Sequence, residues 1–471
     1  METPAACQER FREAYREYEK TEALDRLRAA EYARLDDAGH VYLDYTGGGL
    51  YAAVQLRRHF ELLERGVFGN PHSHNPSSSA MTELVEKTRR RVLEYFNAPA
   101  DEYVAIFTAN ASNALKLVGE SYPFAPGGRY LLTFDNHNSV NGIREFARAK
   151  GAAIRYAPLV LPEMRVDEAV LDSFLEQGHD GANNLFAFPA QSNFSGVQHP
   201  LEWIAKARSQ GWDVLVDAAA YVPCNRLDIR RWKPDFVPVS FYKMFGYPTG
   251  VGCLIARRDK LKKLHRPWFA GGTITVASVQ GDRYWFSEGA EAFEDGTVDY
   301  LNIPAVAIGL DHLEATGVET IHERCRCLIG WLIAELRTMQ HPNGRPLVRL
   351  YGPPSTERRG GTATMNFYDA EDQVISHLDV EQMAAKRNIS LRTGCFCNPG
   401  GGEVALELSK TELIGCFRST EEAKAGPFTI DDFRLCVDGK STGAVRVSVG
   451  LASNYADVAR FLEFARGLLT A

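Results

Sequence analysis

Short apolar segments alternate with longer amphipathic segments through the middle of the chain. The apolar segments have about four to eight residues, as strands do, and the amphipathic ones about ten or more, as helices do. The predicted strands cover residues 104–108, 130–134, 152–159, 184–193, 213–220, 236–239 and 252–257. Such alternation is typical of a mostly parallel sheet with helices on both faces. The pattern therefore predicts an α/β fold with a doubly wound sheet.

Further helices are predicted outside this alternation, from apolar positions at helical spacing. They cover Gln8–Leu35, Met81–Phe96, Pro304–Leu336 and Tyr455–Leu469. The polar stretch Phe68–Ser79 is too rich in turn residues to form an element and is predicted to be a loop.

These elements predict three parts. Residues 1–40 form an N-terminal helical segment that packs with the smaller domain. Residues 41–304 form the large domain with the parallel sheet, and residues 305–471 form a smaller α+β C-terminal domain.

Composition narrows the class of protein. The 471 residues are 45% hydrophobic and 24% charged, as in ordinary globular proteins. A net charge of −7 argues against a nucleic-acid or a polybasic membrane-binding surface. No apolar run approaches the length of a transmembrane helix, and the N-terminus lacks the apolar core of a signal peptide. With nine scattered cysteines, an odd number, we expect a cytoplasmic protein without a disulfide framework.

Polar residues follow the predicted strands directly. They lie at 108–112, 135–139, 191–193, 217 and 240–243. Because a ligand binds outside the carboxyl ends of the strands in such a sheet, we expect these residues to form one site. A glycine-rich turn follows Lys243. The sequence around it leaves three interpretations of the Lys243 amine: a surface group, a phosphate contact or a Schiff-base nucleophile.

The chemistry of these groups points to one kind of ligand. A helix N-terminus at 108–112 suits a phosphate, and the carboxylate of Asp217 at a strand end needs a cationic partner. A flat, phosphorylated pyridine aldehyde would use both, together with an imidazole to stack on it and Lys243 to bond it. Taken singly, Asp217 is equally a helix cap, and His137 equally a core or surface histidine.

Six motifs match one family in order along nearly the whole chain. The chain resembles the pyridoxal-phosphate enzymes of fold type I, in the class V aminotransferase group, which includes cysteine desulfurases. Within that group it is most similar to the N-terminal desulfurase domain of molybdenum cofactor sulfurases. The motifs are FGNPHS (68–73), DNHNSV (135–140), SFYKMFGYPTGVG (240–252), FEDGTVDYLNI (293–303), RTGCFCNPG (392–400) and DGKSTGAVRVSVG (438–450).

The resemblance implies roles around the ring of pyridoxal 5′-phosphate. Lys243 matches the lysine that forms the Schiff base, and Asp217 the carboxylate that pairs with the pyridinium nitrogen. His137 matches the stacking histidine, and Asn193 the side chain that contacts the phenolic oxygen.

The resemblance also implies a phosphate site and a homodimer. Ala111, Ser112 and Ser240 match the turn and the serine that hold the phosphate. Tyr242 lies where many desulfurases have a histidine that contacts the phosphate. Thr297 matches a threonine that reaches the phosphate of the neighbouring subunit.

Two further positions concern the substrate. Arg446 matches an arginine that binds the substrate carboxylate through two hydrogen bonds, although a salt-bridged edge arginine has the same sequence pattern. Cys395 and Cys397 lie in a glycine-flanked loop that suits a mobile nucleophile. Their spacing resembles half of a zinc site, but no second pair completes it, and no metal is predicted. The resemblance favours Cys397 over Cys395 as the persulfide carrier.

A second cysteine pair, Cys325 and Cys327, is predicted to pack within its helix. The function implied is that of a pyridoxal-phosphate-dependent cysteine desulfurase, which moves sulfur from L-cysteine to an enzyme persulfide and then to a sulfur-acceptor protein. The alternatives are a C–S lyase, an epimerase or an aminotransferase, conceivably in natural-product biosynthesis, and a catalytically inactive dimeric binding protein. We expect the residues after the predicted helix Tyr455–Leu469 to provide no counterpart of the pterin-binding domain of full-length molybdenum cofactor sulfurases.

Overall fold

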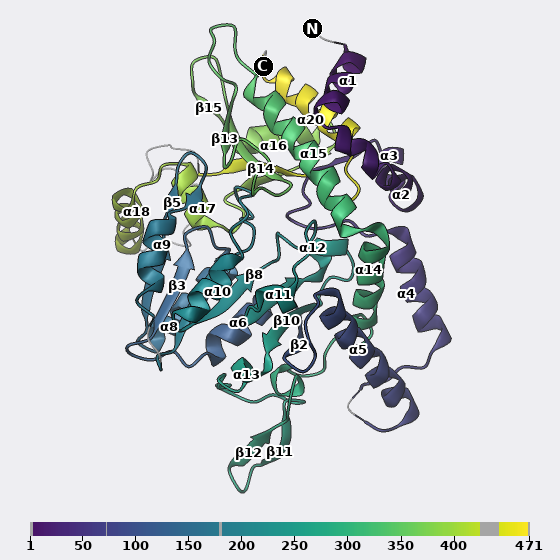
Figure 1. Cartoon of the computed structure of the whole chain (residues 1–471), viewed down its shortest axis with the longest axis vertical. Helices are drawn as coiled ribbons and strands as arrows, with labels where there is room; N and C mark the ends of the chain where they lie inside the picture. Colours follow the sequence, from purple (N-terminus) through teal and green to yellow (C-terminus); the bar gives the residue numbers. More distant parts are fainter. Residues whose placement is uncertain (1–2, 72, 179–180, 424–441, 470–471) are drawn as a thin grey trace.

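The computed structural model describes residues 3–71, 73–178, 181–423 and 442–469. His72 of the FGNPHS motif and residues 438–441 of the last motif lie outside the described residues. The described chain contains two main sheets, one below the other in Figure 1. No helix within these ranges is long and apolar enough to cross a membrane.

The larger sheet has seven strands, all parallel except β10, which is antiparallel to both of its neighbours. The predicted mostly parallel sheet is therefore confirmed. In spatial order the strands are β2 (Tyr103–Thr108), β10 (Gly252–Arg257), β9 (Phe236–Ser240), β8 (Trp212–Asp217), β7 (Asn184–Pro189), β3 (Arg129–Thr133) and β4 (Ala153–Ala157).

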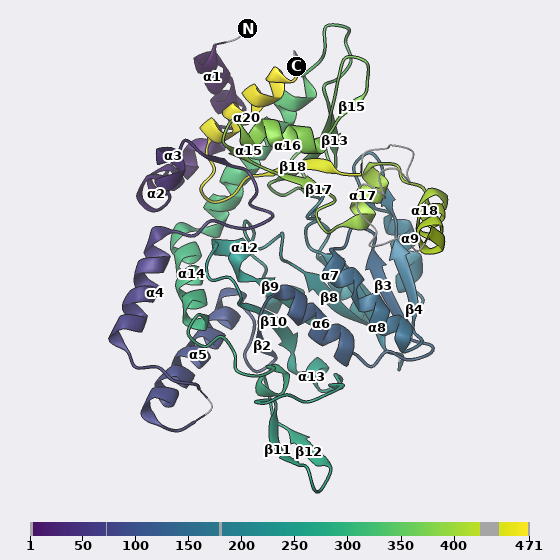
Figure 2. The same cartoon turned by 180° about the vertical axis from the view of Figure 1, so that it is seen from behind.

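Helices cover both faces of this sheet, so its strands are buried on both sides. The helices α6 (Ala111–Ser121) and α8 (Ile143–Ala149) pack on one face, and α10 (Glu202–Ser209) packs on the other (Figures 1 and 2). Successive residues of β8 serve opposite faces: Val214 belongs to the core with α10, and Leu215 to the core with α6. This explains why the strands are continuous apolar runs.

The smaller sheet is antiparallel. It carries Arg446 on one strand, and another strand leads into the loop with Cys395 and Cys397. Its strands, in spatial order, are β13 (Val348–Tyr351), β14 (Thr362–Tyr368), β18 (Ala444–Ser448) and β17 (Arg392–Gly394), with β15 (Val374–Ile375) paired to β14. The helices α15 (Val318–Arg337), α16 (His377–Ala385) and α20 (Tyr455–Gly467) lie beside it (Figure 1).

The predicted helix Gln8–Leu35 is wrong as a single element. The segment forms α1 (Pro4–Ala14), the 3₁₀ turn η1 (Arg16–Thr21), α2 (Ala23–Glu31) and α3 (Arg34–Asp37). The backbone leaves helical geometry at Tyr15 and Tyr32. These bends let Phe11, which is fully buried, pack its ring against Trp331 and Tyr455.

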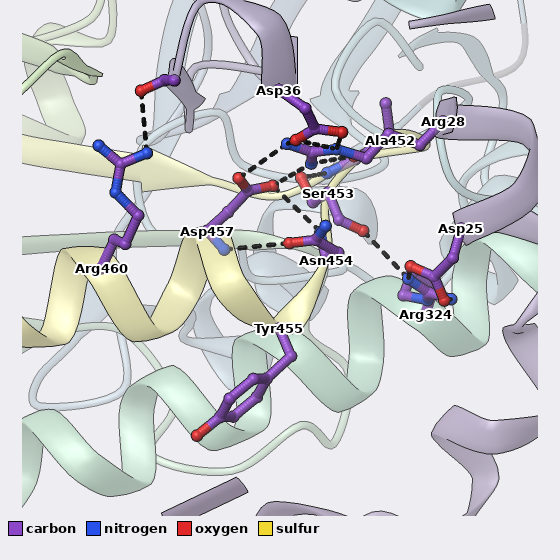
Figure 3. A network of polar contacts seen from close by, with 12 residues as sticks. Asp25, Arg28, Asp36, Arg324, Ala452, Ser453, Asn454, Tyr455, Asp457 and Arg460 are labelled. Atoms are coloured by element: carbon purple, nitrogen blue, oxygen red, sulfur yellow. Dashed lines mark hydrogen bonds and ion pairs between the residues drawn. The ribbon is translucent and has the colours of Figure 1, made fainter. Parts of the chain in front are cut away.

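Two buried arginines tie this segment to the smaller sheet's helices (Figure 3). Arg324 of α15 pairs with Asp25 at 2.7 Å and donates to the carbonyl of Ser453 at 3.3 Å. Arg28 of α2 pairs with Asp457 of α20 at 2.5 Å and donates to the carbonyl of Ala452. The N-terminal segment therefore holds the turn that follows β18.

Two other predicted boundaries are wrong. The helix predicted for residues 304–336 is broken at Gly317, whose φ of 85° ends α14 (Ile303–Thr316) before α15 begins. The predicted polar loop ends earlier than expected, because the side chain of Asn75 caps α5 (Pro76–Tyr95) through the amide of Ser78 at 3.0 Å.

The remaining elements connect these parts. The strands β11 (Ile274–Ser278) and β12 (Arg283–Phe286) form a hairpin that projects from the molecule in Figure 1. The others are β1 (Val41–Tyr42), β5 (Leu159–Val160), β6 (Arg165–Val166), β16 (Ile389–Ser390), α4 (Ala53–Arg65), α7 (Asn138–Asn141), α9 (Glu168–Leu175), α11 (Ile229–Trp232), α12 (Phe241–Phe245), α13 (Arg258–Leu261), η2 (Glu291–Phe293), α17 (Pro399–Ala405) and α18 (Lys410–Ala423).

Candidate active site

A cavity of about 390 Å³ lies at the carboxyl ends of the parallel strands. The turns after β2, β3, β8 and β9 all contribute to its wall, as the position of a ligand site in a doubly wound sheet requires. The predicted residues that line it are Ala111, Ser112, His137, Asp217, Ser240, Tyr242 and Lys243.

Lys243 lies on the short helix α12 rather than on the predicted loop, because the chain turns into a helix directly after β9. Gly246, with φ of 79°, ends this helix after one turn. Burial lowers the pKa of the Lys243 amine below its ordinary 10.5, and the charge of Asp217 opposes this shift. A lowered pKa increases the neutral fraction of the amine, which is the nucleophilic form.

Asp217 ends β8 and is 8% exposed. Its Oδ1 accepts a hydrogen bond of 3.0 Å from the amide of Ala219, which fixes the carboxylate at the floor of the cavity. A carboxylate held this way is suited to pair with a protonated ring nitrogen.

His137 precedes α7 and caps it. Its Nδ1 accepts a hydrogen bond of 3.1 Å from the amide of Ser139, so the proton of the neutral ring is on Nε2. Burial lowers the pKa of His137 below its ordinary 6.5; Asp217 opposes this, while Lys243 and Arg446 add to it. The ring is therefore neutral at pH 7 and can stack on a flat ligand.

The pKa shift of His137 predicts a pH dependence of stability. The folded pKa lies below the unfolded value, so the unfolded chain takes up the proton first as the pH falls through 6.5. We expect the urea midpoint of the holoenzyme to fall between pH 7.5 and 5.5, and to fall less steeply in His137→Gln. Equal slopes in the two proteins would contradict this assignment.

A phosphate fits at the N-terminus of α6. Backbone amides in the first turn of a helix lack partners within the helix, and those of Ala111 and Ser112 are in this turn. The Oγ of Ser112 is 2.6 Å from the Oγ of Ser139, so two hydroxyls meet at this end of the cavity. Gly252 allows the close approach of β10, since a Cβ there would lie 2.7–2.9 Å from the backbone of Asn110 and Ala111.

The predicted residue Thr297 does not line this cavity. Thr297 is exposed and lines a neighbouring cavity of about 250 Å³, which shares Ala109, Gly250 and Val251 with the first. Within one chain the structure therefore does not bring Thr297 into the set around Lys243.

The cysteine loop lies between β17 and α17 and is held against the site by three amide groups. The side chain of Asn193 donates to the carbonyl of Phe396 at 2.7 Å, and the amide of Asn138 donates to the carbonyl of Cys397 at 2.7 Å. The side chain of Asn398 donates to the carbonyl of Asp135, also at 2.7 Å. Asn138 lies in the polar stretch 135–139 that was expected at the site, whereas Asn398, which is adjacent to Cys397, was not predicted as a site residue.

Both thiols of this loop are exposed, while its backbone is constrained. Phe396 and Cys397 have φ values of 57° and 55°, in the left-handed region that residues other than glycine rarely adopt.

Arg446 lies in β18, between β14 and β17, and is 3% exposed, so it is not an edge arginine. Its Nη1 donates to the carbonyl of Asn193 at 2.9 Å, and the ring of Phe396 lies 4.6 Å from its guanidinium. Its Nε is buried and has no hydrogen-bond partner among the described residues. Since a buried donor is normally paired, this Nε is available for a ligand.

Cys325 and Cys327 do not form a second reactive site. Cys325 and Cys327 are buried in α15, as predicted, and burial raises the pKa of both thiols, with a hydrogen bond to Cys224 as the largest cause for Cys325. Cys416 is disulfide-bonded. Across the described ranges, no group of three or more His, Cys, Asp or Glu residues is arranged to hold a metal ion.

Comparisons with known proteins identify the family. The family model for aminotransferase class V matches residues 41–461. The molybdenum cofactor sulfurase of Arabidopsis thaliana is 37% identical over 94% of this chain and 57% of its own length. That of Homo sapiens is also 37% identical, over 94% of this chain and 51% of its own length. This chain thus spans about half the length of these relatives.

A solved structure has the same fold. The apo structure of a cysteine desulfurase from Thermococcus onnurineus NA1 superposes with a TM-score of 0.75 at 22% sequence identity, covering 94% of this chain and 97% of that one. The predicted fold type I is thereby confirmed. The chain belongs to the aminotransferase class V family, whose cofactor is pyridoxal 5′-phosphate.

Proposed function

We propose that this protein is a cysteine desulfurase that moves the sulfur of L-cysteine to Cys397 and releases L-alanine. One observation carries the proposal: the loop with Cys397 is hydrogen-bonded to the turns that hold His137 and Asn193, beside the cavity of Lys243. A persulfide-forming enzyme needs a thiol that reaches the bound substrate and is also exposed to an acceptor.

The chain's residues divide the work. Bound pyridoxal 5′-phosphate supplies an electron sink that makes the substrate's α-proton acidic. The amine of Lys243 takes this proton, and the carboxylate of Asp217 keeps the ring nitrogen protonated. Arg446 binds the substrate carboxylate through its Nε, which has no hydrogen-bond partner among the described residues.

The sulfur transfer balances without a further reactant. The thiolate of Cys397 attacks the substrate sulfur, so an S–S bond forms and the C–S bond breaks. The electron pair of the C–S bond stays on the β-carbon, which takes up a proton, and the amine of Lys243 returns the α-proton to the α-carbon to give alanine. The exposed loop then presents the persulfide to an acceptor protein, the partner we propose for this chain.

The partner subunit belongs to the same proposal. Thr297 is exposed beside the cofactor cavity but does not line it. A homodimer in which this residue reaches the phosphate of the other copy would use it. Light scattering on the holoenzyme measures this, and a monomer with full activity would contradict it.

The reaction is tested by incubating the holoenzyme with L-cysteine. We expect equal early amounts of L-alanine and of one extra sulfur on the peptide that contains Cys397, measured by mass spectrometry. A C–S lyase would instead release pyruvate or sulfide and leave the peptide unmodified. An epimerase or aminotransferase would act without breaking the C–S bond.

A further inference from the structure

The carboxylate of Asp44 lies between two arginines at the edge of the site. Its Oδ1 is 3.1 Å from Nη2 of Arg446, and its Oδ2 is 2.5 Å from Nη2 of Arg392. Asp44 and Arg446 are buried, at 6% and 3% exposure, while the side chain of Arg392 is half exposed. Asp44 is therefore the acidic partner of the buried guanidinium of Arg446.

The backbone fixes Asp44 beside the strand that carries Arg446. Asp44 forms a parallel bridge with Ser448 of β18, and the amide of Ser448 donates to the carbonyl of Leu43 at 2.7 Å. The amide of Thr46 donates to the Oγ of Ser448 at 2.9 Å. The position of Asp44 relative to Arg446 is thus set by two hydrogen bonds donated by backbone amides.

Gly47 leaves space for this carboxylate. A Cβ at this position would lie 2.5 and 2.6 Å from the two oxygens of Asp44 and 2.8 Å from Nη2 of Arg392. Any larger residue would displace the carboxylate from between the two arginines. The close approach of Gly47 to the Asp44 carboxylate is an observation separate from the ion pairs. It fixes the carboxylate in the same position between the two arginines.

The cluster has two positive charges and one negative charge. The Nη1 of Arg446 is occupied by the carbonyl of Asn193, and its Nη2 by Asp44, so the guanidinium plane is fixed. Its buried Nε has no partner among the described residues. One further carboxylate would both satisfy this donor and balance the charge.

We propose that Asp44 is a positioning residue that orients Arg446 for the α-carboxylate of the substrate. The inference rests on the proposed amino-acid substrate but not on the transfer of its sulfur. Asp44 does not touch the substrate; it holds the plane of Arg446 and shields it from the charge of Arg392. Without it, two unpaired guanidinium groups repel each other and the buried one loses its orientation.

The test is Asp44→Asn in the holoenzyme, with L-cysteine and its carboxylate-free analogue cysteamine as substrates. We expect the KM for L-cysteine to rise about tenfold, with kcat changed less than about threefold. The kinetics with cysteamine should be unchanged. Binding of L-alanine, measured by calorimetry without turnover, should weaken by about the same tenfold factor.

Two variants make the result specific. Gly47→Ala keeps the charge of Asp44 but displaces it, so it should weaken L-alanine binding in the same direction, and it replaces Asp44→Asn if that variant does not fold. Asp457→Asn removes an equally buried partner of an arginine, Arg28, away from the cavity (Figure 3). It should lower the unfolding midpoint and leave the KM unchanged.

The outcomes separate this inference from the proposed function. A wild-type holoenzyme that binds L-alanine but forms no persulfide defeats the desulfurase proposal and leaves the Asp44 experiment readable from binding. Wild-type protein that does not bind L-alanine overturns the inference. An equal loss with cysteamine, or an equal rise of KM in Asp457→Asn, also overturns it, because the effect would then be general destabilisation.

Discussion

Lys243→Ala is expected to lower the turnover of L-cysteine by about 10⁴-fold, because the variant loses both the covalent anchor of the cofactor and the group that moves the α-proton. Burial lowers the pKa of this amine in the folded protein, which suits it to both tasks. The measurements are the rate of alanine release and the labelling of residue 243 by borohydride reduction of the holoenzyme.

A matched control separates the amine from general surface charge. Lys206 of α10 is 47% exposed, pairs with Asp172 of α9 and does not line the cavity. Lys206→Ala should retain wild-type turnover and the label at residue 243. If Lys243→Ala keeps more than about a tenth of the wild-type rate, the assignment of this lysine is wrong.

Cys397→Ser is the second large effect. The hydroxyl that replaces the thiol is a poor nucleophile toward sulfur, so we expect alanine formation to fall by about 10⁴-fold or more. The variant should still bind L-alanine with wild-type affinity, since Arg446 and Lys243 are unchanged. Mass spectrometry should find no extra sulfur on the loop peptide.

Cys395→Ser is the control for this experiment, because Cys395 is exposed in the same loop two residues away. The backbone carbonyl of Cys397, rather than that of Cys395, is bound to the amide of Asn138 beside His137. We expect Cys395→Ser to retain most of the alanine release and the extra sulfur. The reverse result, with Cys395 essential and Cys397 dispensable, would exchange the two roles.

The sheet could be predicted because its strands are buried on both faces. Apolar runs such as residues 213–217 need no tertiary information to be recognised. The elements of the N-terminal segment were predicted less accurately than the strands of the sheet. The segment breaks at Tyr15, beside the ring of Phe11 that packs against α15 and α20, and at Tyr32, whose hydroxyl forms a hydrogen bond with His312 of α14. Local helix propensity does not contain that information.

The cavity residues could be predicted because they follow strands that end at one edge of the sheet. Asn193 was predicted to contact the cofactor, but in the structure it also holds the cysteine loop, through Phe396. Asp44 was missed, since it lies about 400 residues before Arg446 and only the parallel bridge to Ser448 brings them together. A contact between distant segments has no signal in local sequence.

The N-terminal segment has a practical consequence for recombinant work. The family match begins at residue 41, yet Arg324 and Asp457, both inside the matched range, have their charged partners at Asp25 and Arg28. A shortened gene that starts at residue 41 would produce chains in which Arg324 and Asp457 have lost their charged partners. Such chains would be expected to collect in inclusion bodies, because the cooperative unit begins well before the range matched by the family model.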